Sequence, residues 1–556
     1  MLTVIFITAL VLFSLAYIFY GKFLENKFNI SNSCPTPSHT DYDGIDRVPA
    51  KTPVLLGHHF SSIAGAGPIV GPIIAAVAFG WAPALLWVII GSIFIGGVHD
   101  FSSLIASIRH KARSIAEIAK EYMSGLAYKL FLLFIWLALV YVLIVFTDLT
   151  ATTFVEDGGV ASSSIMFMVL AIGFGLSVYR FKIPIIWATL IFVPLVFLAV
   201  WVGQLLPLPV NNLPALFGMD SAKTWNIILI VYCFIAATTP VWILLQPRDY
   251  LSSYLLYASV LGGFLGILFG GFSVQYPAFN AWDVPQIGSL FPILFITVAC
   301  GACSGFHSIV ASGTSSKQLD KETDAKTIGY GAMLIEGVVA VIAIVTVAMI
   351  AKGDQLTGKA PLMIYGTGIG NFLAAFGIPH KIGFSFGLLA LSTFILTTLD
   401  TCTRLGRYIF EEFFKLKNPK LRYLSTIATL IIPAIFVLIT LRDPNGNPIP
   451  AWKVIWPVFG ATNQLLAGLA LLVVTVWLKK TGKRTVFVVL PMLFMVVMTI
   501  WALVLLIGQY GFTTIGIIAS ILLVLAFVVI IEAIRTLSKV QKIDKQLTPE
   551  LNRVAE

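Results

Sequence analysis

The chain has 556 residues, of which 58% are hydrophobic and only 11% are charged. Soluble domains average about 45–50% apolar and about 25% charged residues, so this composition excludes a water-soluble globular protein. A bilayer dissolves such a chain directly, at about 20 apolar residues for each spanning helix. We therefore predict an all-α polytopic membrane protein.

Uncharged apolar runs predict about fifteen transmembrane helices. The runs lie near residues 2–20, 59–80, 82–98, 129–147, 160–178, 183–203, 225–246, 254–271, 289–312, 329–351, 384–403, 423–441, 455–478, 485–507 and 513–534. The first run has no preceding basic stretch and no small-residue cleavage site, so we expect a retained helix. The stretch from Ala360 to Pro379 is glycine-rich and interrupted, which favours a re-entrant or interfacial hairpin over a full span.

The net charge of +10 is explained by where the basic residues fall between these spans. With the N-terminus outside, only six of the 36 Lys and Arg residues lie outside, namely Lys223, Lys352, Lys359, Lys381, Arg442 and Lys453. Lys and Arg beside spans stay cytoplasmic, so the asymmetry predicts an outside N-terminus and a cytoplasmic C-terminus. A nucleic-acid partner is not expected. The sequence has no Walker A motif, and we predict neither ATP-driven pumping nor a cofactor.

The second predicted span is unusually rich in helix-breaking residues. Between Gly57 and Ile73 it holds four glycines and two prolines. In a helix interior each glycine costs up to about 1 kcal/mol and each proline about 3 kcal/mol. In lipid, a broken helix belongs in a protein-lined cavity where its backbone groups can bind something. The sequence therefore predicts a substrate site here, with the candidates His58, His59, Ser62, Gly65 and Gly67. The alternative is that the small residues only permit close helix crossing.

The seventh predicted span ends in a second interrupted stretch, where Pro240 kinks or breaks the helix. If the second span begins a five-helix repeat, the seventh begins the next one in the opposite orientation, because five is odd. Paired broken helices in inverted repeats indicate a secondary transporter site near the membrane midplane. Thr238, Thr239 and Trp242 are the candidate pocket residues on this span.

The ninth predicted span ends with several hydroxyl side chains, among them Ser312, Thr314 and Ser315. Hydroxyl oxygens within one or two turns suit a Na⁺ ion if carbonyls of a broken helix complete its shell. They can equally bond to their own helix or join neighbouring helices.

Ionisable residues in or near spans are costly in lipid and are functional candidates by default: His58, His59, Asp100, Asp148, Glu336 and Asp400. Asp400 lies in a hydroxyl-rich span end with Arg404 one turn along, so an intrahelical ion pair competes with a proton- or ion-coupling role. The two histidines could carry protons or help to hold an anionic substrate.

Four long strings resemble the carbon starvation protein A family, at residues 57–72, 301–313, 399–408 and 456–467. The resemblance covers nearly the whole chain, which looks shorter than the larger members. Members are bacterial inner-membrane transporters linked to nutrient limitation, described as peptide transporters or, in some cases, as proton-coupled pyruvate importers. The resemblance implies a five-plus-five inverted-repeat core like that of LeuT and the amino acid–polyamine–organocation transporters, with extra N- and C-terminal helices.

By the same resemblance, the second, seventh and ninth spans correspond to the broken first, broken sixth and eighth core helices. This mapping pairs Ala64, Gly65 and Gly67 with Ser312, Ser315 and Ser316 as a possible cation site. The expected organisation is an N-terminal helix and cytoplasmic loop at 1–56, a transport core at 57–408, C-terminal spans at 409–536 and a cytoplasmic tail at 537–556.

We therefore expect a secondary importer of short peptides or pyruvate, coupled to protons or sodium, in a bacterial inner membrane. Its expected partners are that small solute, a coupling cation and lipid; the sequence leaves the solute, the cation and the oligomeric state open. Two rival hypotheses are a membrane redox or metal-binding protein that uses His58, His59, His99 and His307, and a nutrient sensor without flux.

Overall fold

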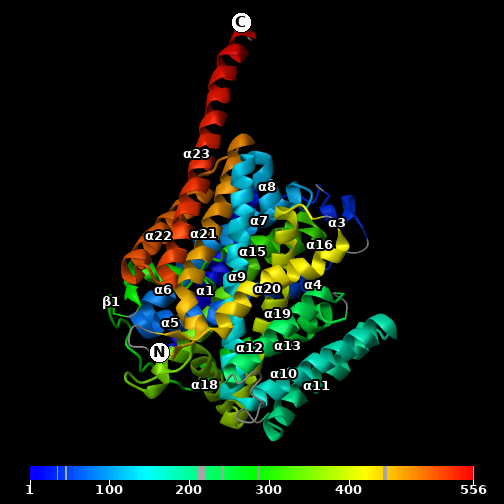
Figure 1. Cartoon of the computed structure of the whole chain (residues 1–556), viewed down its shortest axis with the longest axis vertical. Helices are drawn as coiled ribbons and strands as arrows, with labels where there is room; N and C mark the ends of the chain where they lie inside the picture. The colour runs from blue at the N-terminus through cyan, green and yellow to red at the C-terminus, as the bar shows by residue number, and fades with distance from the viewer. Residues whose placement is uncertain are drawn as a thin grey trace.

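The structure is a computed structural model, and it describes every residue except 34, 44–46, 209–219, 241–242, 286, 417, 443–447 and 555–556. The described chain is mostly helical, which confirms the predicted all-α class (Figure 1). Its strands form two antiparallel hairpins, β1 (Asp283–Val284) with β2 (Gly288–Ser289), and β3 (Leu441–Arg442) with β4 (Pro448–Ile449).

Most helices of the N-terminal half overlap the predicted runs. In chain order, the helices of this half are α1 (Leu2–Leu15), α2 (Gly21–Phe28), α3 (Pro37–Thr40), α4 (Thr52–Ile63), α5 (Gly67–Phe79), α6 (Trp81–Gly91), α7 (Gly97–Arg109), α8 (Ile115–Tyr122), α9 (Gly125–Glu156), α10 (Gly158–Gly175), α11 (Ile185–Leu205), α12 (Ser221–Thr238) and α13 (Leu245–Phe269). Of these, α2, α3 and α8 lie outside the predicted runs. Wider π-helical turns continue three of these helices, at Ala16–Tyr20, Ser92–Gly96 and Leu176–Arg180.

The C-terminal half contains shorter pieces between long helices. They are α14 (Leu290–Thr297), α15 (Gly305–Val310), α16 (Ser316–Gln318), α17 (Ala332–Ala348), α18 (Pro361–Ala374), α19 (His380–Phe413), α20 (Arg422–Leu438), α21 (Ala451–Lys480), α22 (Val486–Tyr510) and α23 (Thr514–Val554). Short 3₁₀ and π turns lie at Ala311–Ser315, Glu322–Asp324, Lys326–Gly331, Gln355–Gly358 and Pro419–Leu421.

Within the described residues, twelve helices are long and apolar enough to cross a membrane, or thirteen when the bent pair α4–α5 counts as one span. The predicted number of fifteen is therefore not confirmed. The difference lies in two of the predicted spans. Residues 289–312 are divided into α14, with 8 residues, and α15, with 6, while α20 has only 17.

The predicted hairpin at 360–379 is one helix, α18, of 14 residues. At 1.5 Å per residue it is about 21 Å long, shorter than a hydrocarbon core of about 30 Å. It packs against α19, α13 and α17 and is not a candidate span.

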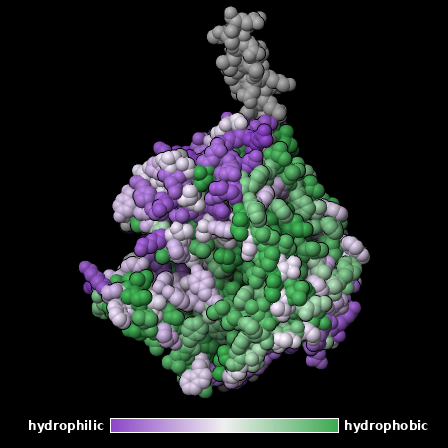
Figure 2. Space-filling view, turned by 180° about the vertical axis from the view of Figure 1, so that it is seen from behind, coloured by the Kyte–Doolittle hydropathy of each residue, from purple (hydrophilic) through white to green (hydrophobic). Residues whose placement is uncertain are grey.

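The N-terminus and the end of α23 lie at opposite ends of the molecule (Figure 1). Several loops meet at the end from which α23 projects: Pro35 pairs with Lys321, Ala50 pairs with Leu319, and Arg109 forms an ion pair with Glu322 at 2.9 Å. We call this end the C-terminal side. Polar residues gather there, above a largely apolar surface (Figure 2). Such an apolar belt is the surface that a bilayer covers.

Two helix pairs, α9 with α12 and α19 with α20, are packed in the same way. In each pair the second helix packs on the first. The pairs meet where α9 packs along α19 and where α12 contacts α20. On the other side of the bundle, α5 packs against α6, α14 and α17. The hairpin of α10 and α11 lies outside this pattern, at the edge of the molecule (Figure 1).

The orientation of these ends can be tested with cysteines in exposed loops. With Cys34 replaced by serine, we expect Lys352→Cys to react with a membrane-impermeant maleimide in intact cells. Arg484→Cys should react only after permeabilisation, because basic loops stay cytoplasmic. The other four cysteines are buried and serve as the unlabelled background. Labelling of Arg484→Cys in intact cells would reverse the predicted orientation.

Candidate functional site

The predicted break in the second span is present. α4 ends at Ile63, α5 begins at Gly67, and the two helices are bent by 48°. Pro68 lies in the first turn of α5, where a missing N–H costs little because that group has no helical acceptor. The residues of the break, Ala64 to Ala66, are buried.

The second interrupted span differs from the one that the resemblance implied. The chain leaves the helix after Thr297 and resumes it at Gly305, with Gly301 at a φ of +84°. This is the predicted ninth span. The predicted seventh span instead ends as a helix at Thr238, ahead of Pro240, and is followed by α13. The difference arises because Pro240 follows the end of α12, whereas Gly301 and Gly305 lie within a span and separate α14 from α15.

The two breaks cross at close range, and glycines make the crossing possible. A β-carbon on Gly67 would lie 2.4 Å from the Cβ and Sγ atoms of Cys300, and one on Gly71 would lie 2.4 Å from the carbonyl oxygen of Thr297. A β-carbon on Gly65 would lie 2.7 Å from Oγ1 of Thr398 on α19. Gly67 and Gly71 therefore permit close crossing of the two segments, which is the alternative role that the sequence suggested for the small residues.

Two amide side chains of α21 bind the backbone of the α14–α15 break. Asn463 Oδ1 accepts hydrogen bonds from the backbone N–H of Phe306, at 3.0 Å, and from Ser304 Oγ, at 3.2 Å. Gln464 Nε2 donates to the carbonyl oxygens of Phe295, at 3.0 Å, and Ala299, at 3.3 Å. One residue thus caps the start of α15 and its neighbour caps the end of α14.

Three further side chains bind carbonyl oxygens of the same break. Trp87 Nε1 donates to Val298 at 3.2 Å, Trp456 Nε1 donates to Thr297 at 3.4 Å, and Ser92 Oγ donates to Gly301 at 2.8 Å. The break is therefore held by α6, the turn after it, and α21. The sequence pattern did not predict this role of Asn463 and Gln464, which lie in one of the segments that resemble the family. The residues that they cap are distant in the sequence, so no local pattern indicates the contact.

The serine side chains predicted to bind a cation form hydrogen bonds with their own and neighbouring helices. Ser312 Oγ donates to the carbonyl of Ser308 at 2.6 Å and accepts from the backbone N–H of Ile115 at 3.0 Å. Ser316 Oγ accepts from Ser107 Oγ at 2.9 Å. Ser315 Oγ lies 2.7 Å from Nδ1 of His59, which joins α4 to the ninth span.

The other residues predicted on α4 lie beside the break. Ser62 Oγ donates to the carbonyl of His58 at 2.8 Å, so it bonds back to its own helix. Ala64 is buried at the break itself. The structure therefore gathers His58, His59, Ser62 and the broken backbone on one segment.

Asp400 has a different partner from the one that its spacing suggested. It pairs with Arg248 of α13 and accepts a hydrogen bond from Tyr232 of α12 at 2.9 Å. Arg248 is fully buried, and its Nη2 also lies 3.4 Å from Asp249. Arg404 instead donates to the carbonyl oxygens of Ala236, at 2.9 Å, and Thr239, at 3.0 Å. Sequence reasoning missed Arg248, although its place in the Gln246–Tyr250 stretch at a span end was a usable signal.

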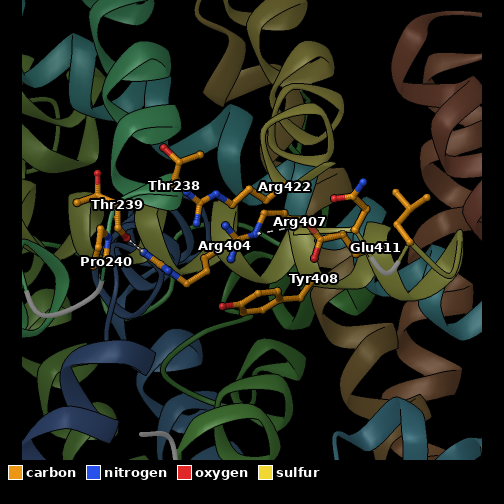
Figure 3. Close-up of a pocket in the computed structure, with 10 residues that line it drawn as sticks. Thr238, Thr239, Pro240, Arg404, Arg407, Tyr408, Glu411 and Arg422 are labelled. Carbon is orange, nitrogen blue, oxygen red and sulfur yellow. Dashed lines mark hydrogen bonds and ion pairs between the residues drawn. The ribbon is translucent and has the colours of Figure 1, made fainter. Parts of the chain in front are cut away.

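Thr238 and Thr239 line a pocket of about 430 Å³ together with Pro240, Tyr408, Glu411, Leu416, Asn418 and three arginines, Arg404, Arg407 and Arg422. Figure 3 shows Arg404 turned toward Thr239 at the end of α12. Arg407 Nη1 donates to the carbonyl of Ala237 at 2.9 Å. The residues that line this pocket include none from α4 or α5. Trp242 lies outside the described residues.

Comparisons with known proteins place the chain in a family. The family model of carbon starvation protein CstA matches residues 1–364 and 355–502. The peptide transporter CstA of Bacillus subtilis is 30% identical over 600 residues, covering 97% of this chain and 97% of the relative. The pyruvate/proton symporter BtsT of Escherichia coli is 30% identical over 582 residues, covering 90% of this chain and 81% of the relative.

Two solved structures show weaker similarity. MhsT in complex with L-phenylalanine has a TM-score of 0.46 and 13% identity, covering 87% of this chain and 99% of that one. A manganese transporter of Eremococcus coleocola has a TM-score of 0.45 and 16% identity, covering 88% of this chain and 95% of that one.

The fold and the crossing breaks define a multi-pass helical membrane protein with a buried polar centre. The family match extends over nearly the whole length of that fold. The chain belongs to the carbon starvation protein CstA family.

Replacing Asn463 tests its role at the break. Asn463→Ala removes the acceptor of the Phe306 N–H and leaves a buried donor unpaired, which costs about 1–3 kcal/mol. We expect a clearly lower unfolding temperature in detergent. Thr462→Ala is the matched control on the same helix, because its hydroxyl only bonds back to Val458. Equal unfolding temperatures for the two variants would contradict the proposed cap.

Proposed function

We propose that the protein is a secondary active transporter that imports a small carboxylated nutrient, pyruvate or a short peptide, across a bacterial inner membrane. The observation that carries this proposal is the crossing of two interrupted, buried spans beside buried charged side chains. Interrupted spans of this kind are where secondary transporters bind solutes and ions. The names of the relatives favour transport over the redox and sensor alternatives.

The packing supports a division into two groups of helices that move against each other. One group contains the broken spans with α6 and α17; the other contains α9, α12, α19 and α20. We propose that the transport core runs from residue 57 through α21, beyond the predicted boundary at 408, because Asn463 and Gln464 of α21 hold the second break. The solute would bind beside the α4–α5 break, near His58, His59, Ser62, Gly65 and Gly67.

The arrangement of charges favours protons over sodium as the coupling ion. A Na⁺ site near the α4–α5 break would need free oxygen ligands. Asp400 on α19 is already paired with the fixed cation of Arg248, and Ser312 and Ser316 are engaged with α8 and α7. One relative is named a pyruvate/proton symporter, which agrees with this choice.

The arginine-lined pocket suits the release of a carboxylate. With the C-terminal side in the cytoplasm, as the charge asymmetry predicts, the pocket opens toward the inner face. Arg404 and Arg407 offer the donors that a carboxylate prefers, and Thr238 and Thr239 lie beside them. We propose that this pocket receives the solute after it leaves the breaks.

Reconstitution tests the proposal directly. The purified protein in liposomes is given first an inward proton gradient and then an inward sodium gradient, and the uptake of labelled pyruvate and of a labelled dipeptide is followed. We expect accumulation of at least one solute under the proton gradient alone. Accumulation that depends on sodium would contradict the coupling ion, and no uptake of either solute under either gradient would contradict transport.

Substitution at the first break links uptake to this geometry. Gly65→Leu drives a side chain into Thr398 and Phe146, so we expect uptake to fall to the level of empty liposomes while the protein still inserts into the membrane. Gly508→Leu is the matched control, because nothing lies within 4 Å of a β-carbon there. Wild-type uptake by Gly65→Leu would remove the break from the transport site.

A further inference from the structure

A second buried group of ionisable side chains lies apart from Asp400 and Arg248. His307 of α15 lies between two carboxylates, with Nδ1 at 2.8 Å from Oδ2 of Asp100 and Nε2 at 3.2 Å from Oε2 of Glu336. Asp100 Oδ1 lies 2.7 Å from Nδ1 of His99. All four residues are fully buried. They come from three helices, α7, α15 and α17.

The surroundings supply little that could neutralise this group. His59 faces it from α4, and the thiols of Cys300 and Cys303 face it from the α14–α15 break. Within the described part of the chain, no side chain donates a hydrogen bond to Glu336, and the backbone N–H of Gly301 is the donor directed at its carboxyl group. One backbone donor does not offset the cost of ionising a buried carboxylate, so its charge must be balanced by a proton close by.

The contact between His307 and Glu336 requires a proton between the two side chains. When Nδ1–H of His307 donates to Asp100, a neutral imidazole presents the lone pair of Nε2 to Glu336. An ionised Glu336 at 3.2 Å would then repel it in a medium of low dielectric constant. The contact is favourable only with one proton between the two groups, on either Nε2 or the carboxyl oxygen.

This proton would respond to movement of the broken span. His307 is the third residue of α15, which begins directly after the break, whereas Glu336 lies on the continuous helix α17. A shift of α15 against α17 would separate the two groups and admit water. Separation removes the reason for sharing the proton, so its affinity depends on the conformation of the break.

We infer that His307 and Glu336, with Asp100 as the fixed anion, form the site that carries the coupling proton. This inference rests on the proposed transport function and adds to it a proton site distinct from Asp400 and from the His58–His59 pair.

The test separates coupling from solute movement in liposomes that contain the full chain. Glu336→Gln keeps the shape of the side chain and removes its proton exchange. We expect it to reduce the accumulation of labelled pyruvate or dipeptide driven by a proton gradient by about tenfold or more. Exchange of external labelled solute for internal unlabelled solute, without a gradient, should stay within about twofold of the wild type, because exchange needs no net proton transfer.

His307→Gln is the second variant and should show the same split. Glu412→Gln is the matched control, since this partly buried carboxyl on α19 uses one oxygen to accept a hydrogen bond from the hydroxyl of Tyr128, and an amide oxygen can replace that acceptor. We expect the control to keep both activities. An infrared difference spectrum recorded on solute addition should also show a protonated carboxyl band that Glu336→Gln lacks.

The contradicting results are distinct. Gradient-driven accumulation by Glu336→Gln at the wild-type level would overturn the proton site and leave the proposed transport intact. Loss of both accumulation and exchange in a folded Glu336→Gln protein would assign the residue to solute binding, and overturn the proton site as well. A wild-type protein that neither accumulates nor exchanges solute would overturn the proposed function together with this inference.

Discussion

In the hydrocarbon core of a membrane no water is available to bind a free backbone N–H or C=O, so each interruption of a helix must be satisfied by protein. In this chain the constraint falls on the seven residues between α14 and α15. Side chains from two other parts of the sequence meet it, with Asn463 and Gln464 at the two helix ends and Trp87 and Ser92 at the carbonyl groups between them. The interruption between α14 and α15 is thus stabilised by specific side chains of the fold.

The crossing of the two breaks follows from that arrangement. The backbone between α14 and α15, held by these hydrogen bonds, lies directly against α5. The close approach is possible because Gly67 and Gly71 have no side chain at the contact. The crossing also fixes where charge can be placed. Two buried groups flank it, one around Arg248 and Asp400 and the other around His307 and Glu336. The proposed proton coupling uses the second of these groups, because His307 belongs to the interrupted span and Glu336 to the continuous helix α17.

Composition and hydropathy were sufficient to predict the helical membrane fold, because both are properties of the chain as a whole. The glycines and prolines from Gly57 to Pro72 likewise predicted the first break, since their effect on a helix is local. The number of spans was not confirmed. Hydropathy counts residues 289–312 as one span whether or not the helix is continuous, whereas the structure divides them.

Pairings between distant segments could not be predicted from spacing. Asp400 was expected to interact with Arg404, one turn along the same helix, yet Arg248 reaches it from α13 and Arg404 caps α12. The same limit applied to His307, whose partners Asp100 and Glu336 lie 207 residues before it and on a later helix. Thr238 and Thr239, predicted as pocket residues where Pro240 interrupts the helix, lie at the end of α12 and line a pocket whose arginines the spacing did not indicate.

The contact between the two breaks is the central claim, and a double-mutant cycle on thermal unfolding in detergent tests it most directly. Gly67→Ala places a methyl group against Cys300, whose side chain Cys300→Gly would remove. We predict that Cys300→Gly restores much of the unfolding temperature that Gly67→Ala loses, so that the two changes are not additive. Losses that simply add would show that residues 67 and 300 do not touch, and would contradict the crossing on which the site depends.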